Sequence, residues 1–337
     1  MHTNQTNMQN EPTSTYARAI REAIAKLDNT IVYYPAMKNA IDGLNECISW
    51  SEFNKEPVGA VLVGTGGMGK TTICNLIVKN FPPQIVENNL ANVLTIPAFY
   101  SSIPSPSTIK SLAVNLLESL GDPFPKKGSA NVLTTRLYTL LKQCQTKIIL
   151  LDEFHHLLLE GSATEKRTHK ICNWLKSLIN NTGVMVCLIG TPSCEALVNF
   201  DSQMSRRFMH RYRLNLLDAG TTIKPGPLGG FLRALSKKYV KHLMLDGMPD
   251  FNNHHHVEQM LAATSGNPSF VVALMKKATA NAMIASRNIV VIEDFADAFD
   301  TEISAPVAEF EENPFRMTER QLALKLGYKA LKGKKSC

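Results

Sequence analysis

Residues 64–72 read Gly-Thr-Gly-Gly-Met-Gly-Lys-Thr-Thr, and this stretch decides the fold. It follows a short apolar run at 59–63 and precedes apolar residues with helical spacing, Ile73, Leu76 and Ile77. The stretch satisfies the phosphate-loop pattern GxxxxGK[ST] between a strand and a helix, which is the context that pattern requires. Its glycines let successive backbone N–H groups point at phosphate oxygens, and the helix start adds partial positive charge. The sequence therefore predicts a nucleotide-binding site.

Two side chains of this loop have specific expected roles. Lys70 is expected to reach the β- and γ-phosphates, and the Thr71 hydroxyl to ligate Mg²⁺. ATP and Mg²⁺ are therefore the expected cofactors. The predicted nucleotide contacts of the loop are Gly64, Thr65, Gly66, Gly67, Met68, Gly69, Lys70, Thr71 and Thr72.

Two carboxylates, Asp152 and Glu153, follow the apolar run 148–151. Ligands of parallel sheets bind at the carboxyl ends of the strands, so Asp152 is predicted to join the Mg²⁺ site. Glu153 is predicted to polarise the attacking water as general base, which a pure nucleotide switch would not need. The alternative is that these acids cap a helix. With the phosphate loop upstream, the pair favours an ATPase.

Further site candidates lie later in the chain. Thr191 follows the apolar run 184–189 and is placed to hydrogen-bond the γ-phosphate or the attacking water; a helix cap is the alternative. Arg206 and Arg207 precede the last strand pattern, where they cannot easily reach the phosphate of their own chain. An arginine from a neighbouring subunit stabilises the charge that develops in phosphoryl transfer. The sequence therefore predicts a site shared between subunits.

Short apolar runs alternate with helical patterns, which predicts an α/β core with a five-stranded parallel sheet. A proline and glycine cluster at 225–230 precedes further helical patterns, which predicts a small α-helical lid. The predicted strands lie at 59–63, 93–99, 148–151, 184–189 and 212–216. The expected organisation is a disordered leader at 1–15, N-terminal helices at 16–57, the nucleotide-binding core at 58–224, the lid at 225–303 and a basic tail at 304–337.

The composition excludes several classes of protein. With 44% hydrophobic and 19% charged residues, the chain of 337 residues is ordinary globular protein. No apolar run approaches the roughly 18 residues of a membrane helix, and the N-terminus lacks the features of a signal peptide, so a cytoplasmic location without membrane contact is expected. Of the net charge of +7, residues 313–337 contribute +6 through seven Lys/Arg and one Glu. Such a tail either contacts nucleic acid or an acidic partner, or is simply solvated.

Together these motifs resemble the AAA+ ATPases and, among them, the TniB/TnsC family of transposition regulators, which includes the TnsC proteins of CRISPR-associated transposons. The resemblance spans about residues 30–300, and its motifs are the phosphate loop, DEFHHL at 152–157, IGTP at 189–192 and SRRF at 205–208. It implies an AAA+ core with a helical lid. The roles that it implies are the first sensor for Thr191, the arginine finger for Arg206 and Arg207, and nucleotide contacts for Tyr34 and Pro35.

One motif departs from the related ATPases. Their lid helix often begins with Gly-x-Pro-Arg, whose arginine contacts the γ-phosphate as a second sensor. This chain has Gly266-Asn267-Pro268-Ser269 at the corresponding place. The resemblance therefore gives no arginine contact from the lid.

The resemblance also implies a biological role. It implies an ATP-dependent homo-oligomeric ring or filament on double-stranded DNA that links a target-selection protein of the TniQ type to a transposase. Initiator-type AAA+ proteins have an additional helical element facing DNA between the second and third strands, so Lys110, Lys126 and Lys127 are the implied DNA contacts. Lysines in a loop are more often merely solvated. The alternatives are a STAND-type signalling NTPase, a replication initiator or loader, and a non-enzymatic scaffold.

Overall fold

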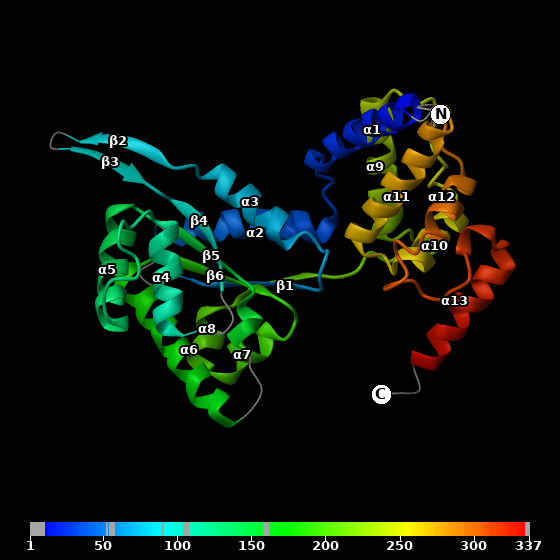
Figure 1. The fold of residues 1–337 in the computed structure, drawn as a ribbon. Helices are drawn as coiled ribbons and strands as arrows, with labels where there is room; N and C mark the ends of the chain where they lie inside the picture. The colour runs from blue at the N-terminus through cyan, green and yellow to red at the C-terminus, as the bar shows by residue number, and fades with distance from the viewer. Residues whose placement is uncertain are drawn as a thin grey trace, which may run out of the picture. The chain divides into compact units, whose positions relative to one another are not determined.

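The computed structural model describes residues 11–51, 53, 58–88, 91–103, 108–157 and 162–333 (Figure 1). The chain forms two compact units. The first combines Met1–Tyr34 with Leu216–Cys337, and the second is Pro35–Asn215. The second unit contains every β-strand of the two sheets.

The main sheet of the second unit has five parallel strands in the order β4-β5-β6-β1-β7. Their bounds are β1 Ala60–Gly64, β4 Ala98–Ser102, β5 Ile148–Asp152, β6 Met185–Gly190 and β7 His210–Leu214. Every residue of β1, β5 and β6 is buried, as expected for central strands covered on both faces. The predicted α/β class with a five-stranded parallel sheet is confirmed.

Helices cover both faces of this sheet. One apolar cluster joins a face of the strands to α4 Ile109–Ser119, α5 Ala130–Gln143, α6 Ser162–Thr182, α7 Cys194–Phe200 and α8 Ser202–Arg207. The helices α2 Pro35–Ser51 and α3 Lys70–Asn80 contact β1, with α2 also against β7 and α3 against β4. A short 3-10 helix, η2 Phe154–Leu157, follows β5. The six described cysteines are all buried thiols.

The strand predicted at 93–99 is wrong in its bounds. Its first half belongs to β3 Ala91–Thr95, which pairs antiparallel with β2 Gln84–Asn88, and only β4 enters the main sheet. Pro97 separates the two strands because it has no N–H to donate to a ladder. Figure 1 shows the β2–β3 hairpin projecting away from the sheet of its unit. The last strand, predicted at 212–216, begins two residues earlier, at His210.

The first unit is helical throughout its regular elements. They are α1 Glu11–Ala25, η1 Lys26–Asn29, α9 Pro227–Leu243, α10 His254–Thr264, α11 Pro268–Ile284, α12 Ile292–Phe299, η3 Pro314–Arg316 and α13 Glu319–Gly333. Helix α1 starts inside the segment expected as a leader, with Pro12 in the first turn, where proline is tolerated. Residues 1–10 of that leader lie outside the described residues.

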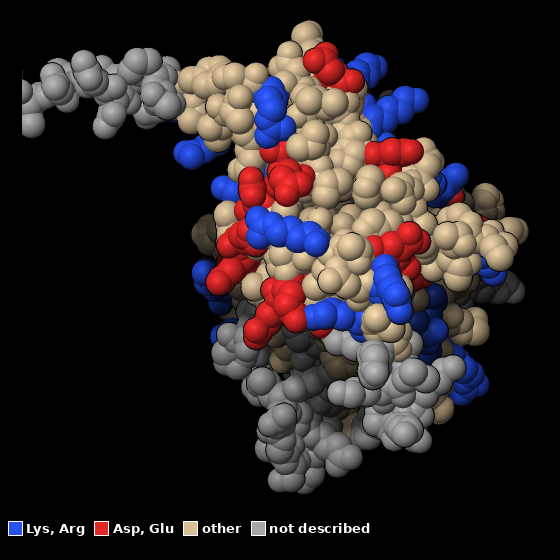
Figure 2. All heavy atoms as spheres, turned by 90° about the vertical axis from the view of Figure 1, so that its right-hand side faces the viewer, with Lys and Arg blue, Asp and Glu red and all other residues tan. Residues whose placement is uncertain are grey.

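The segment expected as a basic tail is packed in its described part. Phe315 and Leu322 are buried, and Arg316 lies 2.7 Å from the Asp300 carboxylate. Lys325 pairs with Glu312. These ion pairs neutralise part of the positive charge that the composition assigned to the tail. On the face shown in Figure 2, the coloured basic and acidic side chains are interspersed.

None of the helices that the structure describes combines the length and the apolar character needed to cross a membrane.

Candidate functional site

The phosphate loop joins β1 to α3 at the carboxyl end of β1. Gly67 and Gly69 have φ values of 80° and 82°, a left-handed conformation that residues with a Cβ rarely adopt. A Cβ added at Gly66 or Gly69 would meet no atom within 4 Å, so the space in front of the loop is open. This shape and the uncapped start of α3 fit a bound phosphate.

Lys70 is the first residue of α3, and its side chain folds back across the loop. Its Nζ donates hydrogen bonds to the carbonyl oxygens of Gly64 at 2.8 Å and Thr65 at 2.9 Å. The ammonium is thereby held beside the loop on which phosphates would lie. Thr71 is exposed, whereas the side chain of Met68 is fully buried in the core, so Met68 has only its backbone to offer a ligand.

Asp152 is the last residue of β5 and is only 3% exposed. Its Oδ2 accepts a hydrogen bond from the Tyr100 hydroxyl at 2.8 Å, and its Oδ1 accepts one from the Glu153 N–H at 2.8 Å. Two donors on one carboxylate fix its orientation and leave the remaining lone pairs for a cation. Sequence reasoning missed Tyr100. Its contact with Asp152 depends on the register of β4 beside β5. The predicted strand at 93–99 ended before Tyr100, so nothing in the sequence placed Tyr100 beside Asp152.

Glu153 adopts a left-handed backbone conformation, with φ at 58°. Such a conformation is costly for a residue other than glycine and is common at functional sites. Its Oε2 lies 3.9 Å from Nε2 of His156, whose Nδ1 is 3.1 Å from the Ile103 carbonyl oxygen. The Glu153 carboxylate therefore lies beside His156 of the short helix that follows β5.

The same charged groups act on two buried thiols. Burial is the main reason that the pKa of Cys194 rises to about 12, to which Glu153 and Asp152 add and which Lys70 opposes. Burial likewise raises the pKa of Cys74 to about 12, with Asp152 adding and Lys70 opposing. Because β1 and β5 both pair in parallel with β6, the phosphate loop with Lys70 and the pair Asp152 and Glu153 lie at the same carboxyl edge of the sheet, and we call these three residues the charged cluster.

Thr191 directly follows β6, the strand between β5 and β1, so it lies at the same edge as this cluster. Its Oγ1 is 2.7 Å from the Ser193 Oγ. The N-cap of α7 is Ser193, whose own side chain makes no capping hydrogen bond. Thr191 therefore lies at the predicted edge, with Ser193 as the partner of its hydroxyl.

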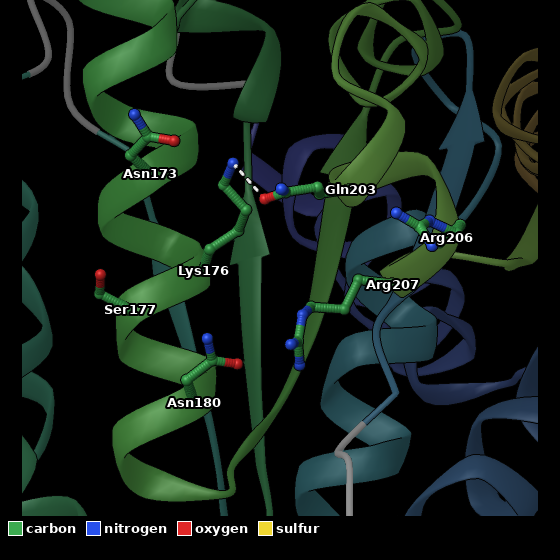
Figure 3. Close-up of a pocket in the computed structure, with 7 residues that line it drawn as sticks. All are labelled: Asn173, Lys176, Ser177, Asn180, Gln203, Arg206 and Arg207. Carbon is green, nitrogen blue, oxygen red and sulfur yellow. Dashed lines mark hydrogen bonds between the residues drawn. The ribbon is translucent and has the colours of Figure 1, made fainter.

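Arg206 and Arg207 occupy the last turn of α8. Arg206 is exposed, and Arg207 is half-buried, with an Nη1 that has no hydrogen-bond partner among the described residues. Figure 3 shows the pocket of 510 Å³ that they line, with Arg207 extending toward α6. The other lining residues are Asn173, Lys176, Ser177, Asn180 and Gln203. The described lining includes no residue of the phosphate loop, so the arginines and the loop occupy different places on the unit.

The two nucleotide contacts that the resemblance implies before α2, Tyr34 and Pro35, belong to different units. Tyr34 is 4% exposed and packs edge to face on Phe231, with ring centroids 6.2 Å apart, inside the first unit. Pro35 begins α2 of the second unit. The segment that replaces the second sensor starts α11, where the Asn267 side chain accepts a hydrogen bond from the Ser269 N–H at 3.0 Å.

The three lysines implied as DNA contacts, Lys110, Lys126 and Lys127, are all exposed, but Lys110 lies apart from the other two. Lys126 lies 3.5 Å from the Glu118 carboxylate, and the Lys127 ammonium lies 5.8 Å from the centre of the Phe124 ring, both in the turn between α4 and α5. Arg136 anchors that turn by donating to the Phe124 carbonyl oxygen at 2.8 Å. Lys110 lies in the first turn of α4, about 12 Å along the helix axis from Glu118, at 1.5 Å per residue. The structure therefore brings Lys126 and Lys127 together and leaves Lys110 at the other end of α4.

Comparison with known families gives a match to the model described as "Bacterial TniB protein" over residues 23–215. No curated protein sequence matches the chain significantly.

Solved structures with a similar fold are distant in sequence. Cdc6p of Pyrobaculum aerophilum is 14% identical with a TM-score of 0.54, the match covering 83% of this chain and 71% of that one. ORC1 of Aeropyrum pernix, solved in complex with DNA, is 18% identical with a TM-score of 0.54, covering 81% of this chain and 66% of that one. A Walker-type ATPase of Pyrococcus abyssi is 13% identical with a TM-score of 0.50, covering 77% of this chain and 72% of that one. At this level of identity the likeness establishes the AAA+ fold.

Proposed function

This chain belongs to the TniB family and is a P-loop ATPase, and we propose that it uses ATP to assemble on double-stranded DNA as a regulator of transposition. The observation that carries the proposal is the charged cluster of Lys70, Asp152 and Glu153 at the sheet edge of a chain whose residues 23–215 match the TniB model. In this role the assembly recruits a transposase and links it to a target-selection protein of the TniQ type. Hydrolysis then permits disassembly.

The chain's own residues account for the hydrolytic step. Lys70 and the loop N–H groups bind the phosphates, and the Glu153 carboxylate accepts the proton of the water that attacks the γ-phosphorus as the bond to the ADP oxygen breaks. Thr71 and Asp152 would hold Mg²⁺, which neutralises charge on the phosphate oxygens when bound. Tyr100 and the Glu153 N–H keep Asp152 in place for that role.

Tyr100→Phe tests the support of the proposed Mg²⁺ ligand. The substitution removes the hydrogen bond to Asp152 Oδ2 while keeping the ring. Loss of such an outer partner typically costs about 10- to 100-fold in metal affinity or activity, so the Mg²⁺ concentration for half-maximal ATPase activity should rise by about tenfold or more. ATPase assays across a Mg²⁺ titration measure this. Tyr138→Phe, a half-buried tyrosine on α5, is the matched control, and an unchanged Mg²⁺ requirement in Tyr100→Phe would remove Tyr100 from the site.

The DNA contact is supported by the ordered α4–α5 turn, which presents Lys126 and Lys127 together. Binding along the DNA phosphates needs only a few positive side chains in each subunit, which an oligomer repeats along the duplex. Such binding does not depend on the DNA sequence. Homo-oligomerisation is supported by Arg206, which is exposed and lines a pocket apart from the phosphate loop of its own chain.

ATP, and not ADP, should drive self-association on duplex DNA, with little preference for sequence. Affinity should fall by about a thousandfold between roughly 50 and 200 mM salt if about six phosphates are contacted, because phosphate contacts release counterions. Charge reversal at Lys126 and Lys127 should weaken binding to all sequences alike and reduce the salt slope by about one for each lysine lost. Sedimentation and electron microscopy with a slowly hydrolysed ATP analogue measure the assembly.

The control for this prediction is Lys79→Glu, which reverses an exposed lysine near the end of α3. Its binding should match that of the unchanged protein. A protein that stays monomeric with the analogue and long DNA contradicts the ring or filament. Assembly that occurs but fails to stimulate a transposase encoded beside it favours the initiator or loader alternative.

A further inference from the structure

Helix α8 is too short to hold its own position. It has six residues, Ser202–Arg207, and isolated helices shorter than about 12 residues are marginal in water. Its direction therefore depends on the contacts at its two ends. Since both arginines lie in its last turn, those contacts also set where the guanidinium groups point.

The C-terminal end of α8 is anchored in the core of the second unit. Phe208, the C-cap residue, is fully buried. The Gly59 N–H donates to the Arg207 carbonyl oxygen at 2.8 Å, and a Cβ at Gly59 would lie 2.5 Å from the Phe208 ring. Burial of the Phe208 ring therefore keeps this end against the core when the contacts at the other end are lost.

The N-terminal end is held by a polar link to α6. Asp201 is the N-cap, and its Oδ1 accepts hydrogen bonds from the Gln203 N–H at 2.8 Å and the Met204 N–H at 3.1 Å. Its Oδ2 accepts from Lys176 Nζ of α6 at 2.8 Å, and the same Nζ donates to Gln203 Oε1 at 3.2 Å. Figure 3 shows Lys176 reaching from α6 to Gln203.

This link is an ion pair that is largely shielded from water. The Lys176 and Asp201 side chains are 15% and 14% exposed. The hydrogen bond from Lys176 holds the pKa of the Asp201 carboxyl below its usual value. One carboxylate thus caps the helix and ties its first turn to α6, whereas the pair has no contact with the phosphate loop in the described structure.

We infer that Asp201 and Lys176 are positioning residues for Arg206 and Arg207, fixing the direction in which α8 presents them. The inference rests on the proposed function, in which an arginine of one subunit completes the ATP site of its neighbour. Because Phe208 and the Arg207 carbonyl oxygen hold the other end, loss of the pair lets this short helix tilt about that end, which redirects the arginines and leaves the unit folded. The defect should therefore lie on the arginine face of a subunit, not in its own nucleotide site.

Three variants separate the two tasks of the carboxylate. Asp201→Ala removes the cap and the ion pair, Asp201→Asn keeps an oxygen that can cap, and Lys176→Met keeps the alkyl stem and removes the charge. The Kd of each monomer for ATP should stay within about twofold, while kcat of the assembly falls by about tenfold or more in Asp201→Ala, as expected when a positioning contact for a reacting group is lost. Asp201→Asn should recover part of that loss. Asp294→Asn is the control, because it breaks a comparable ion pair, with Arg287, at the start of another helix, α12, far in sequence from the arginines of α8.

Mixing experiments give the deciding readout. Asp201→Ala subunits keep their own Glu153, and Glu153→Gln subunits keep an intact α8, so mixed assemblies of the two should regain ATPase activity above either alone. A general loss of folding would not be rescued in this way. If the Arg206→Ala and Arg207→Ala double variant is rescued by Glu153→Gln but Asp201→Ala is not, the positioning role is wrong and the shared site stands. If neither is rescued, the shared site fails and the inference falls with it. If Asp201→Ala does not fold, Lys176→Met is mixed in its place with the same outcomes.

Discussion

Lys70→Ala should remove nearly all ATP binding, whereas Glu153→Gln should leave binding intact and stop hydrolysis. The two residues act on different states. Lys70 contacts phosphates that are already present when ATP binds, while Glu153 acts on the attacking water as the reaction proceeds. Both belong to the charged cluster at the sheet edge, so proximity alone would not distinguish them.

The expected magnitudes are large enough to separate the roles. Each charge-assisted hydrogen bond contributes about 1.5 to 3 kcal/mol, so two lost from Lys70 to the phosphates should weaken the Kd for ATP by at least about a hundredfold. Loss of a general base typically lowers kcat by about 10²- to 10⁴-fold. Calorimetric titration with ATP and a steady-state ATPase assay measure the two quantities.

Lys79→Ala is the matched control, because Lys79 lies on the same helix as Lys70 but is exposed near its other end. It should bind and hydrolyse ATP normally. Normal turnover by Glu153→Gln would remove Glu153 from its catalytic role. Unchanged ATP affinity in Lys70→Ala would place the nucleotide elsewhere.

The sheet was largely predictable from the sequence because its central strands are short, apolar and fully buried. The errors arose where local pattern and tertiary structure disagree. The apolar run 93–99 looks like one strand, yet Pro97 breaks it, and the partner of its first half is the preceding strand β2. The apolar side chains Ile85, Val86 and Leu94 of β2 and β3 are exposed, so their apolar pattern does not mark a buried strand of the main sheet.

The chemical residues were predictable for a related reason. Asp152 ends a buried strand, Thr191 directly follows one, and Lys70 begins the helix that the phosphate loop joins to a third. Parallel topology brings such strand ends to one edge. The supporting residues were not predictable, because Tyr100 meets Asp152 across 52 positions and Lys176 meets Asp201 across 25. Those contacts depend on strand register and helix packing, which no local pattern records.

The arginine motif was predictable as a pair, but the two side chains differ in the structure. Arg206 is exposed, which suits a residue that reaches a neighbour. Arg207 is half-buried, and its Nη1 lacks a hydrogen-bond partner among the described residues. A buried donor without a partner is costly, so an anionic group arriving at this pocket would relieve that cost. Single substitutions of each arginine are therefore informative as well as the double one.

Replacing both arginines by alanine should preserve ATP binding by monomers and abolish hydrolysis and ATP-stabilised assembly. An arginine supplied by a neighbour is worth about 10³- to 10⁵-fold in the rate of phosphoryl transfer, so the loss should be close to complete. Mixing this double variant with Glu153→Gln tests whether the arginine acts between subunits. At some mixed interfaces, an intact Glu153 of one subunit meets intact arginines of the next, and those interfaces should hydrolyse ATP.

In randomly mixed equimolar assemblies, about a quarter of the interfaces pair an intact Glu153 with intact arginines. If each interface hydrolyses ATP independently, the mixture should have roughly a quarter of the ATPase activity of the unchanged protein. Mixing must be verified, for example by fluorescence transfer between differently labelled subunits. If mixed assemblies form and no activity returns, the arginines do not act in trans. If the double variant alone hydrolyses ATP normally, they are not the finger, and Arg211 and Arg213 are the next residues to substitute. Arg213 already forms a two-point ion pair with Glu195 at 2.7 and 2.8 Å, and Arg211 donates to Ser205 Oγ at 3.2 Å, so either would have to leave a partner to serve a neighbour.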